Sequence, residues 1–314
     1  MTRIKSAIIP AAGLGTRMRP ATNAVPKELL PVGGRPAIDW VVEEACLAGI
    51  EEIVVVSSPR KPAIEAYLLT GTWSQSAHPG VTEQLGGHAL ADDVLIRVVH
   101  QLEPRGLGDA VLVGARACPD ASVAVLLPDD LISDHGELLR AMIECHERSG
   151  QSVVSVMSVE REEIGAYGCA VLGKRGPDGE RAVLELVEKP DPELAPSTDA
   201  VAGRYVLGAQ VLRALESIRP DGRGEVQLTA ALDLVAQRGQ LTSVELRERS
   251  QRIDIGNWSG WLEANLQLLG DGNPPTPRWR IASEGPKRLA RAVASERGAP
   301  AGEHPSTTEV SESA

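Results

Sequence analysis

The amino-acid sequence predicts an α/β fold in which a doubly wound αβα layer is followed by a half rich in antiparallel strands. Through the first half, short β-branched runs alternate with segments of helical periodicity, which indicates a parallel sheet with right-handed crossovers. In the second half, strand-like runs follow one another with little helix between them, and such strands more often pair antiparallel. The 314 residues, 42% hydrophobic and 24% charged, suffice for one large domain with additions.

Each element of the first half carries its own signal. Residues 4–9 form an apolar strand that runs into a glycine-rich loop. A helix is expected at residues 36–48, with Ile38, Val41, Val42 and Ala45 on one face and Gly49 at its end. Further strands are expected at 53–56, 94–99 and 122–127, and further helices at 62–69 and 108–117. The polar stretch 71–93 interrupts this alternation, so we expect a surface excursion there.

The second half predicts more strand than helix. Strands are expected at residues 153–159, 170–172, 182–187 and 204–207, and helices at 228–237 and 258–269. From residue 271 the composition shifts to Pro, Gly, Ser and mixed charge, which is typical of a polar, partly disordered tail. Within that tail, residues 287–297 fit one short amphipathic helix.

Charge and composition exclude several classes of protein. A net charge of -11 opposes a broad phosphate-binding surface, and 3% aromatic residues without a phenylalanine leave few rings for base stacking, so no nucleic-acid partner is expected. No stretch approaches the roughly 18 apolar residues of a membrane span, and a signal peptide is not apparent. The four cysteines lie far apart, as in reduced thiols. We therefore expect a cytoplasmic protein without a membrane partner.

The strongest signal for a ligand site directly follows the first expected strand. Residues 11–17 read Ala-Ala-Gly-Leu-Gly-Thr-Arg, and a second cation, Lys27, follows in residues 26–31. Glycines at the C-terminal end of a strand let the backbone approach a ligand and direct N–H groups at phosphate oxygens. The dinucleotide fingerprint fails at Met18. Arg17 and Lys27 beside this loop suit a polyphosphate, and the alternative is a tight turn with two solvated cations.

A pair of carboxylates ends the expected strand at residues 122–127. Asp129 and Asp130 follow it directly, and Asp254 is a distant candidate for a second ligand. Mg²⁺ takes a few oxygen ligands and leaves phosphates to complete its shell. The alternative is that the pair caps a following helix.

An acid and a base, Glu188 and Lys189, end another expected strand, just before Pro190. Side chains alternate across a strand, so these two point to opposite faces unless the backbone bends, and Pro190 makes such a bend plausible. A carboxylate accepts hydrogen bonds from sugar hydroxyls, whereas a lysine offers a point charge to phosphate. The alternative is a solvated strand end. Weaker single candidates are Gly168, Gly203 and Gln101.

Taken together, ten strings resemble one family. They are AAGLGTRMRPAT (11–22), VPKELLPV (25–32), VVEEA (41–45), RGLGDAVL (105–112), VAVLLPDDLI (123–132), AYG (166–168), LVEKP (186–190), GRYVL (203–207), GEVQLT (224–229) and DIG (254–256). In this order, from about residue 3 to residue 269, they resemble the bacterial UTP–glucose-1-phosphate uridylyltransferases, or UDP-glucose pyrophosphorylases, within the sugar-phosphate nucleotidyltransferases.

The resemblance implies a three-layer αβα Rossmann-like nucleotidyltransferase fold with a mixed central sheet and a small β-rich sugar-binding part. The nucleotidyltransferase domain would cover residues 1–270, with a nucleotide-binding half to about residue 150, then a sugar-binding half and a closing helix. Residues 271–314 would be the tail. The implied partners are UTP and a sugar 1-phosphate, the implied cofactor is Mg²⁺, and a homodimer or homotetramer is expected.

The resemblance also assigns roles to residues that match the family motifs. The nucleotide would lie against Ala11, Ala12, Gly13, Gly15, Thr16 and Asp129, with its uracil facing Gln101 and Gly106. The catalytic cations would be Arg17 and Lys27 at the triphosphate and Lys189 at the attacking phosphate. Mg²⁺ would be held by Asp129 and Asp254. The hexose would contact Gly168, Glu188 and Gly203.

Three positions depart from the family pattern. Asp109 stands where a histidine is common, Trp258 lies where the family usually carries a lysine, and Ala230 replaces an acid. We interpret Trp258 as part of the core packing of the last helix, beside Trp261 and Leu262, with a changed substrate as the alternative.

The expected reaction is in-line attack of a sugar 1-phosphate on the α-phosphorus of UTP, which yields a UDP-sugar and pyrophosphate. One alternative is the same chemistry with another nucleotide or a modified sugar. Another is a non-catalytic sugar-nucleotide sensor.

Overall fold

The computed structural model describes residues 3–70, 94–247, 250 and 252–269. The expected excursion at 71–93, the tail at 271–314 and its helix at 287–297 lie outside these residues. Within the described part, no helix is long and apolar enough to span a membrane.

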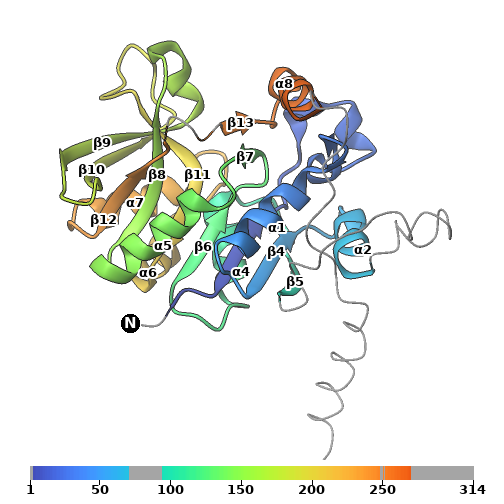
Figure 1. The fold of residues 1–314 in the computed structure, drawn as a ribbon, viewed down its shortest axis with the longest axis horizontal. Coiled ribbons are helices and arrows are strands. Elements are labelled where there is room, and N and C mark those ends of the chain that lie inside the picture. Colours follow the sequence, from blue (N-terminus) through green and yellow to red (C-terminus); the bar gives the residue numbers. More distant parts are fainter. Residues whose placement is uncertain (1–2, 71–93, 248–249, 251, 270–314) are drawn as a thin grey trace, which may run out of the picture.

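One nine-stranded mixed sheet runs through both halves of the chain (Figure 1). Its first four strands are parallel, whereas β11 is antiparallel to both of its main neighbours, and β12 is parallel to β8. The predicted mixed α/β fold is therefore confirmed. In spatial order the strands are β5 (Leu95–His100), β4 (Glu52–Ser57), β1 (Ser6–Pro10), β6 (Val123–Leu126), β11 (Asp199–Leu207), β8 (Ser152–Ser158), β12 (Leu241–Glu245), β10 (Arg181–Glu188) and β9 (Gly168–Arg175).

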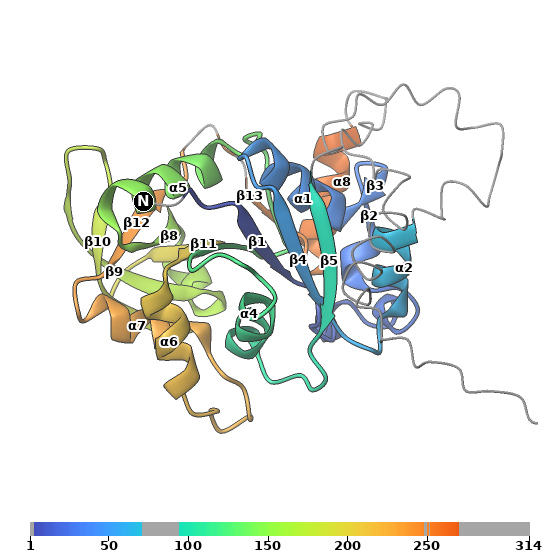
Figure 2. The ribbon, with the colours of Figure 1, turned by 90° about the horizontal axis from the view of Figure 1, so that it is seen from below.

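Helices cover both faces of the sheet and complete three layers (Figure 2). One face packs against α1 (Ala37–Leu47), α2 (Pro62–Thr70) and α5 (Glu137–Ser149), and the other packs against α4 (Leu107–Ala115), α6 (Ala209–Ser217) and α7 (Leu228–Ala236). The side chains of β1 alternate between the two resulting cores, with Ile9 in the first and Ile8 in the second. This is the expected pattern for a strand covered on both faces.

The apolar stripe predicted on α1 is confirmed. Ile38, Val41, Val42 and Ala45 are fully buried, and the helix ends two residues before Gly49, which adopts a positive φ of 89°. This left-handed conformation favours glycine at the end of the helix.

Two helices, α5 and α6, were not predicted. Both are amphipathic, and the buried residues of α5, Leu138, Leu139, Met142, Ile143 and Cys145, follow helical spacing, so the signal was present in the sequence and was overlooked. The remaining predicted helices and strands of the described region are present within a few residues of their expected bounds.

The fold brings the expected site loops to one edge of the sheet. Because β1 and β6 are parallel neighbours, the glycine loop after β1 lies beside Asp129 after β6. A small antiparallel pair, β7 (Asp130–Ile132) with β13 (Arg252–Asp254), then adds Asp254 from far along the chain. The last helix, α8 (Trp258–Leu269), follows β13 and packs on the short strand β2 (Pro31–Val32), which pairs with β3 (Arg35–Pro36).

Candidate active site

The glycine loop is held in place by contacts from the elements around it. Lys61 Nζ donates a hydrogen bond to the carbonyl oxygen of Ala11 at 2.8 Å and contacts both carboxylate oxygens of buried Glu28. Gly15 adopts the left-handed conformation, with φ 62°, and its carbonyl accepts a bond from the Thr22 hydroxyl at 2.8 Å. Gly13 is exposed, and a Cβ there would meet nothing within 4 Å. The backbone at Gly13 is therefore open to a ligand.

Two of the three predicted cations of the site, Arg17 and Lys27, converge on Asp129. Lys27 Nζ lies 2.5 Å from Asp129 Oδ2, and Arg17 Nη2 lies 3.6 Å from the same oxygen. Burial opposes the charge of both Lys27 and Asp129, but their attraction prevails: the pKa of Lys27 is raised and the pKa of Asp129 is lowered. Arg17 remains 63% exposed and so presents free donors to a ligand.

The second predicted carboxylate, Asp254, lies next to Asp129. The N–H of Ile255 donates to the Asp129 carbonyl at 2.9 Å, which joins the two loops. A Cβ on Gly256 would lie 2.8 Å from Arg17 Nη2, 2.9 Å from Asp254 Oδ1 and 3.0 Å from Asp129 Oδ2. Two carboxylates and one guanidinium thus surround a glycine that leaves them room.

The chemistry of these donors fits Mg²⁺. Among the residues the structure describes, no group of three or more His, Cys, Asp or Glu side chains could hold a metal without help. Mg²⁺ is usually held by one or two carboxylates together with substrate phosphates and water. Asp129 and Asp254 supply that number of carboxylates at a place where phosphates can reach them.

Asp130 has a structural partner of its own. It is ion-paired with Arg252, whose guanidinium lies 4.9 Å from the centre of the Tyr167 ring. Burial raises the pKa of Asp130 to about 6 despite that partner. A Cβ on Gly203 would fall 2.0 Å from Asp130 Oδ2, so the glycine makes room for this carboxylate. Gly203 is buried here, and its contact with the hexose stays a prediction.

A fully buried ion pair that was not predicted from the sequence supports the site. Arg204 pairs with Glu44 of α1 through two contacts of 2.8 Å and 2.6 Å. The same guanidinium donates to the carbonyls of Leu127 and Asp130, at 3.2 Å and 2.6 Å, on either side of Asp129. One signal was available: Glu44 lies three residues after Val41, on the apolar stripe of α1, where an acid needs a buried partner.

A pocket of about 250 Å³ adjoins the Asp129 centre. Two expectations are met there. The backbone bends at Lys189, which has a positive φ of 44°, and Glu188 and Lys189 line the same pocket. Glu188 accepts a hydrogen bond from the Thr229 hydroxyl at 2.5 Å. The predicted site residues that line this pocket are Arg17, Asp129, Gly168, Glu188, Lys189 and Asp254.

Of the two residues expected at the nucleobase, Gln101 lines a smaller hollow beside the glycine loop, and Gly106 is bonded to it without lining the hollow. Ala12, Leu14 and buried Gln101 line it, and Gln101 Nε2 donates to the Gly106 carbonyl at 3.1 Å. Gly106 has φ 90°, and a Cβ there would lie 2.9 Å from Glu225 Cβ, so the loop at 224–229 packs directly on it. The assignment of these residues to a nucleotide stays a prediction.

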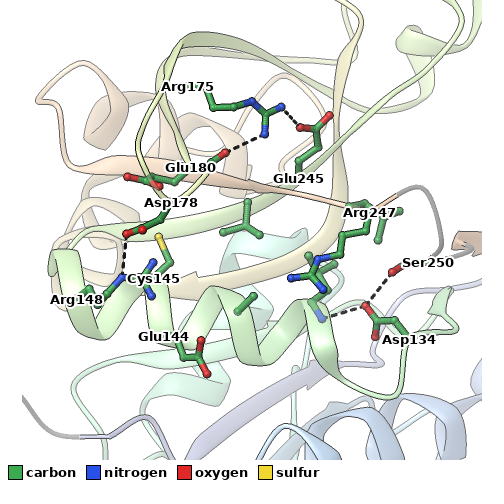
Figure 3. Close-up of a pocket in the computed structure, with 15 residues that line it drawn as sticks. Asp134, Glu144, Cys145, Arg148, Arg175, Asp178, Glu180, Glu245, Arg247 and Ser250 are labelled. Carbon is green, nitrogen blue, oxygen red and sulfur yellow. Dashed lines mark hydrogen bonds and ion pairs between the residues drawn. The ribbon is translucent and has the colours of Figure 1, made fainter.

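A larger cavity, of about 960 Å³, lies between α5 and the β9–β10 hairpin (Figure 3). This cavity is not lined by the glycine loop, by the Asp129 centre or by the strand end at Glu188. Each of the three arginines among its described lining residues pairs with a carboxylate, so these described residues offer a phosphate group no unpaired guanidinium. The pairs are Arg148 with Asp178 at 3.6 Å, Arg175 with Glu245, and Arg247 with Glu137 at 3.3 Å.

Trp258 does not line the pocket of the candidate site. It packs edge-to-face on Trp261, with ring centres 5.7 Å apart, so the expected contact between these two rings is present. The expected core packing is wrong, because Trp258 is 42% exposed and Leu262 is 54% exposed. Because Trp258 does not line the pocket, its position gives no support to a changed substrate.

Comparison with known proteins agrees with this geometry. The nucleotidyl transferase family model matches residues 6–270. A UTP–glucose-1-phosphate uridylyltransferase of Bacillus subtilis, YngB, is 38% identical over 85% of this chain and 90% of its own length, and one of Streptococcus pneumoniae is 35% identical over 84% and 90%.

Solved structures give the same result. A UDP-glucose pyrophosphorylase complexed with UDP-glucose superposes with a TM-score of 0.75 at 32% identity, over 85% of this chain and 99% of that one. A UTP-bound enzyme from Acinetobacter baumannii gives 0.72 at 31% identity, over 92% and 99%. The chain therefore belongs to the nucleotidyl transferase family, in the group of the UTP–glucose-1-phosphate uridylyltransferases.

Proposed function

We propose that this protein transfers the uridylyl group of UTP to glucose 1-phosphate and releases pyrophosphate. The observation that carries the proposal is the convergence of Arg17, Asp129 and Asp254 at Gly256, with Lys27 paired to Asp129, beside a pocket lined by Glu188 and Lys189. A reaction between a nucleoside triphosphate and a sugar phosphate requires fixed cations, an acidic centre and a polar pocket that contact one another.

The chemical difficulty of this reaction is repulsion between two anionic substrates. A phosphate monoester has a second pKa of about 6, so the attacking oxygen is ionised at neutral pH and no general base is required. Arg17 and Lys27 hold the triphosphate of UTP, and Lys189 holds the attacking phosphate, which lowers the repulsion and aligns the two groups. Mg²⁺, held by Asp129 and Asp254, would supply further positive charge to the phosphates.

Glu188 is assigned to the hexose, and Glu188→Gln tests this. The carboxylate lies at the pocket wall beside Gly168 and can accept hydrogen bonds from sugar hydroxyls, which an amide does less well. We expect the KM for glucose 1-phosphate to rise about tenfold, the loss of roughly 1.4 kcal/mol, with little change in the KM for UTP.

Glu185→Gln is the matched control for that variant, since Glu185 is an exposed acid on the same strand that does not line the pocket. Steady-state kinetics with each substrate varied in turn gives both constants. A larger rise in the KM for UTP than in that for the sugar phosphate would contradict the assignment of Glu188.

The whole proposal is tested by pyrophosphate release with Mg²⁺ across a grid of nucleoside triphosphates and sugar 1-phosphates. The fastest turnover with UTP and glucose 1-phosphate supports it. A different best pair shows the same chemistry on other substrates. No turnover with any pair indicates a sugar-nucleotide sensor, a role that the complete set of cations and carboxylates disfavours.

We further propose a cytoplasmic enzyme that forms a homodimer or homotetramer. All four cysteines are free thiols in the structure, as expected for a reducing compartment. Light scattering coupled to size exclusion gives the mass of the assembly, and a monomer at working concentration would contradict the oligomer.

A further inference from the structure

Gln101, at the hollow beside the glycine loop, has one fixed orientation of its side-chain amide. Its Nε2 donates two hydrogen bonds, to the Gly106 carbonyl at 3.1 Å and to Asp109 Oδ2 at 2.7 Å. If the amide were turned over, Oε1 would face two oxygens that can only accept, and both bonds would be lost. The network itself therefore decides which end of the amide faces the hollow.

The orientation leaves an acceptor for a ligand. Within the described part of the chain, no donor is bonded to Gln101 Oε1, although Gln101 is 95% buried and lines the hollow with Ala12 and Leu14. Any donor that enters the hollow can pair with this oxygen, whereas a ligand that presents an acceptor at the same place leaves two acceptors facing each other.

Asp109 is well placed to hold the amide. It lies in the first turn of α4, and two backbone hydrogen bonds with Val226 fix the start of this helix. The N–H of Gly108 donates to the Val226 carbonyl at 2.9 Å, and the N–H of Val226 donates to the Arg105 carbonyl at 2.7 Å. The positive end of the helix favours a carboxylate there, and a carboxylate accepts hydrogen bonds without donating any. A histidine, in contrast, can present either a donor or an acceptor to Gln101.

From these contacts we infer that Asp109 is a positioning residue for base selection: it turns the oxygen of Gln101 toward the nucleobase, so that the site accepts a base whose ring nitrogen carries a hydrogen. Uracil and thymine have such an N3–H. Cytosine presents an unprotonated N3 at the same place, and two acceptors then face each other. The inference rests on the proposed function in placing a nucleotide in this hollow.

The test is the ratio of kcat/KM for UTP to kcat/KM for CTP, measured with wild type and three variants. Asp109→Ala leaves only the Gly106 bond to hold the amide, and the ratio is expected to fall about tenfold, as for the loss of one hydrogen bond. Asp109→Asn keeps an acceptor oxygen without the charge and is expected to stay within about threefold of wild type. Asp109→Lys offers only donors, so it favours the reversed amide and should lower the ratio further than alanine does.

Charge alone predicts a different result. If Asp109 only repels the nucleotide, its removal raises kcat/KM for UTP and for CTP by the same factor. The ratio of the two constants then stays unchanged, and this result would overturn the inference. Glu103→Ala, which removes an exposed acid from the same loop, is the matched control and should not move the ratio. Direct calorimetric binding of UTP and CTP gives the same ratio for any variant whose turnover is too slow to measure.

The same measurements separate this inference from the proposed function. If the wild-type protein prefers dTTP to UTP and still discriminates against CTP, the uridylyl assignment is contradicted. The same result supports the role of Asp109. Wild type that uses CTP as well as UTP overturns the role of Asp109 even if glucose 1-phosphate is the accepted sugar.

Discussion

Asp129→Asn is expected to lower turnover by about 10²–10³, the effect of removing one preorganised electrostatic group from an active site. The carboxylate holds Lys27 at 2.5 Å, attracts Arg17 at 3.6 Å and is one of the two carboxylates that fit Mg²⁺. An amide cannot balance the buried ammonium of Lys27, whose raised pKa depends on this neighbour. The positions of both cations relative to the triphosphate therefore change together.

The measurement is single-turnover pyrophosphate release at saturating substrates, with thermal unfolding to show that the variant is folded. Asp178→Asn is the control, since that exposed aspartate pairs with Arg148 in the larger cavity, away from the candidate site. Near-normal turnover of a folded Asp129→Asn protein would remove Asp129 from the catalytic centre.

The positions of strands and helices were predictable where local pattern decides them. The stripe of α1 and the apolar run of β6 are buried as periodicity predicts, because a two-sided core demands such patterns. Sheet order was not predictable in the same way. β11 inserts between β6 and β8, strands from different halves of the chain, and that choice depends on long-range packing rather than on any local run.

The charged residues of the site were predictable from the sequence, whereas their arrangement in space was not. Arg17, Lys27 and Asp129 stood out as charges beside glycines and a buried strand, yet only the pairing of β13 with β7 brings Asp254 to them. Gly256 carries no mark in the sequence that separates it from an ordinary turn. Glycine is needed here because a Cβ would come within about 3 Å of Arg17, Asp129 and Asp254.

Glu44 was missed because its residue type is polar, although its position lies on the apolar stripe of α1 and faces the core. Glu44→Gln is therefore a stringent test of the buried support beneath the site. Glu44 and Arg204 are nearly inaccessible, and Glu44 holds the pKa of the guanidinium above its ordinary value although burial opposes its charge. Removing the negative partner leaves a buried cation, and we expect the free energy of unfolding to fall by about 3–5 kcal/mol in urea denaturation.

Two comparisons separate this pair from a surface ion pair and from the site itself. Glu51→Gln breaks the Lys5–Glu51 contact of 2.9 Å between half-exposed side chains, and it should cost less than about 1 kcal/mol. Replacing Glu44 and Arg204 together by methionine removes both charges, so much of the stability should return. Turnover should stay low in that double variant, because the carbonyls of Leu127 and Asp130 no longer receive the guanidinium donors that fix the chain on either side of Asp129. Full activity in a stable double variant would show that Arg204 stabilises the fold without positioning the catalytic loop.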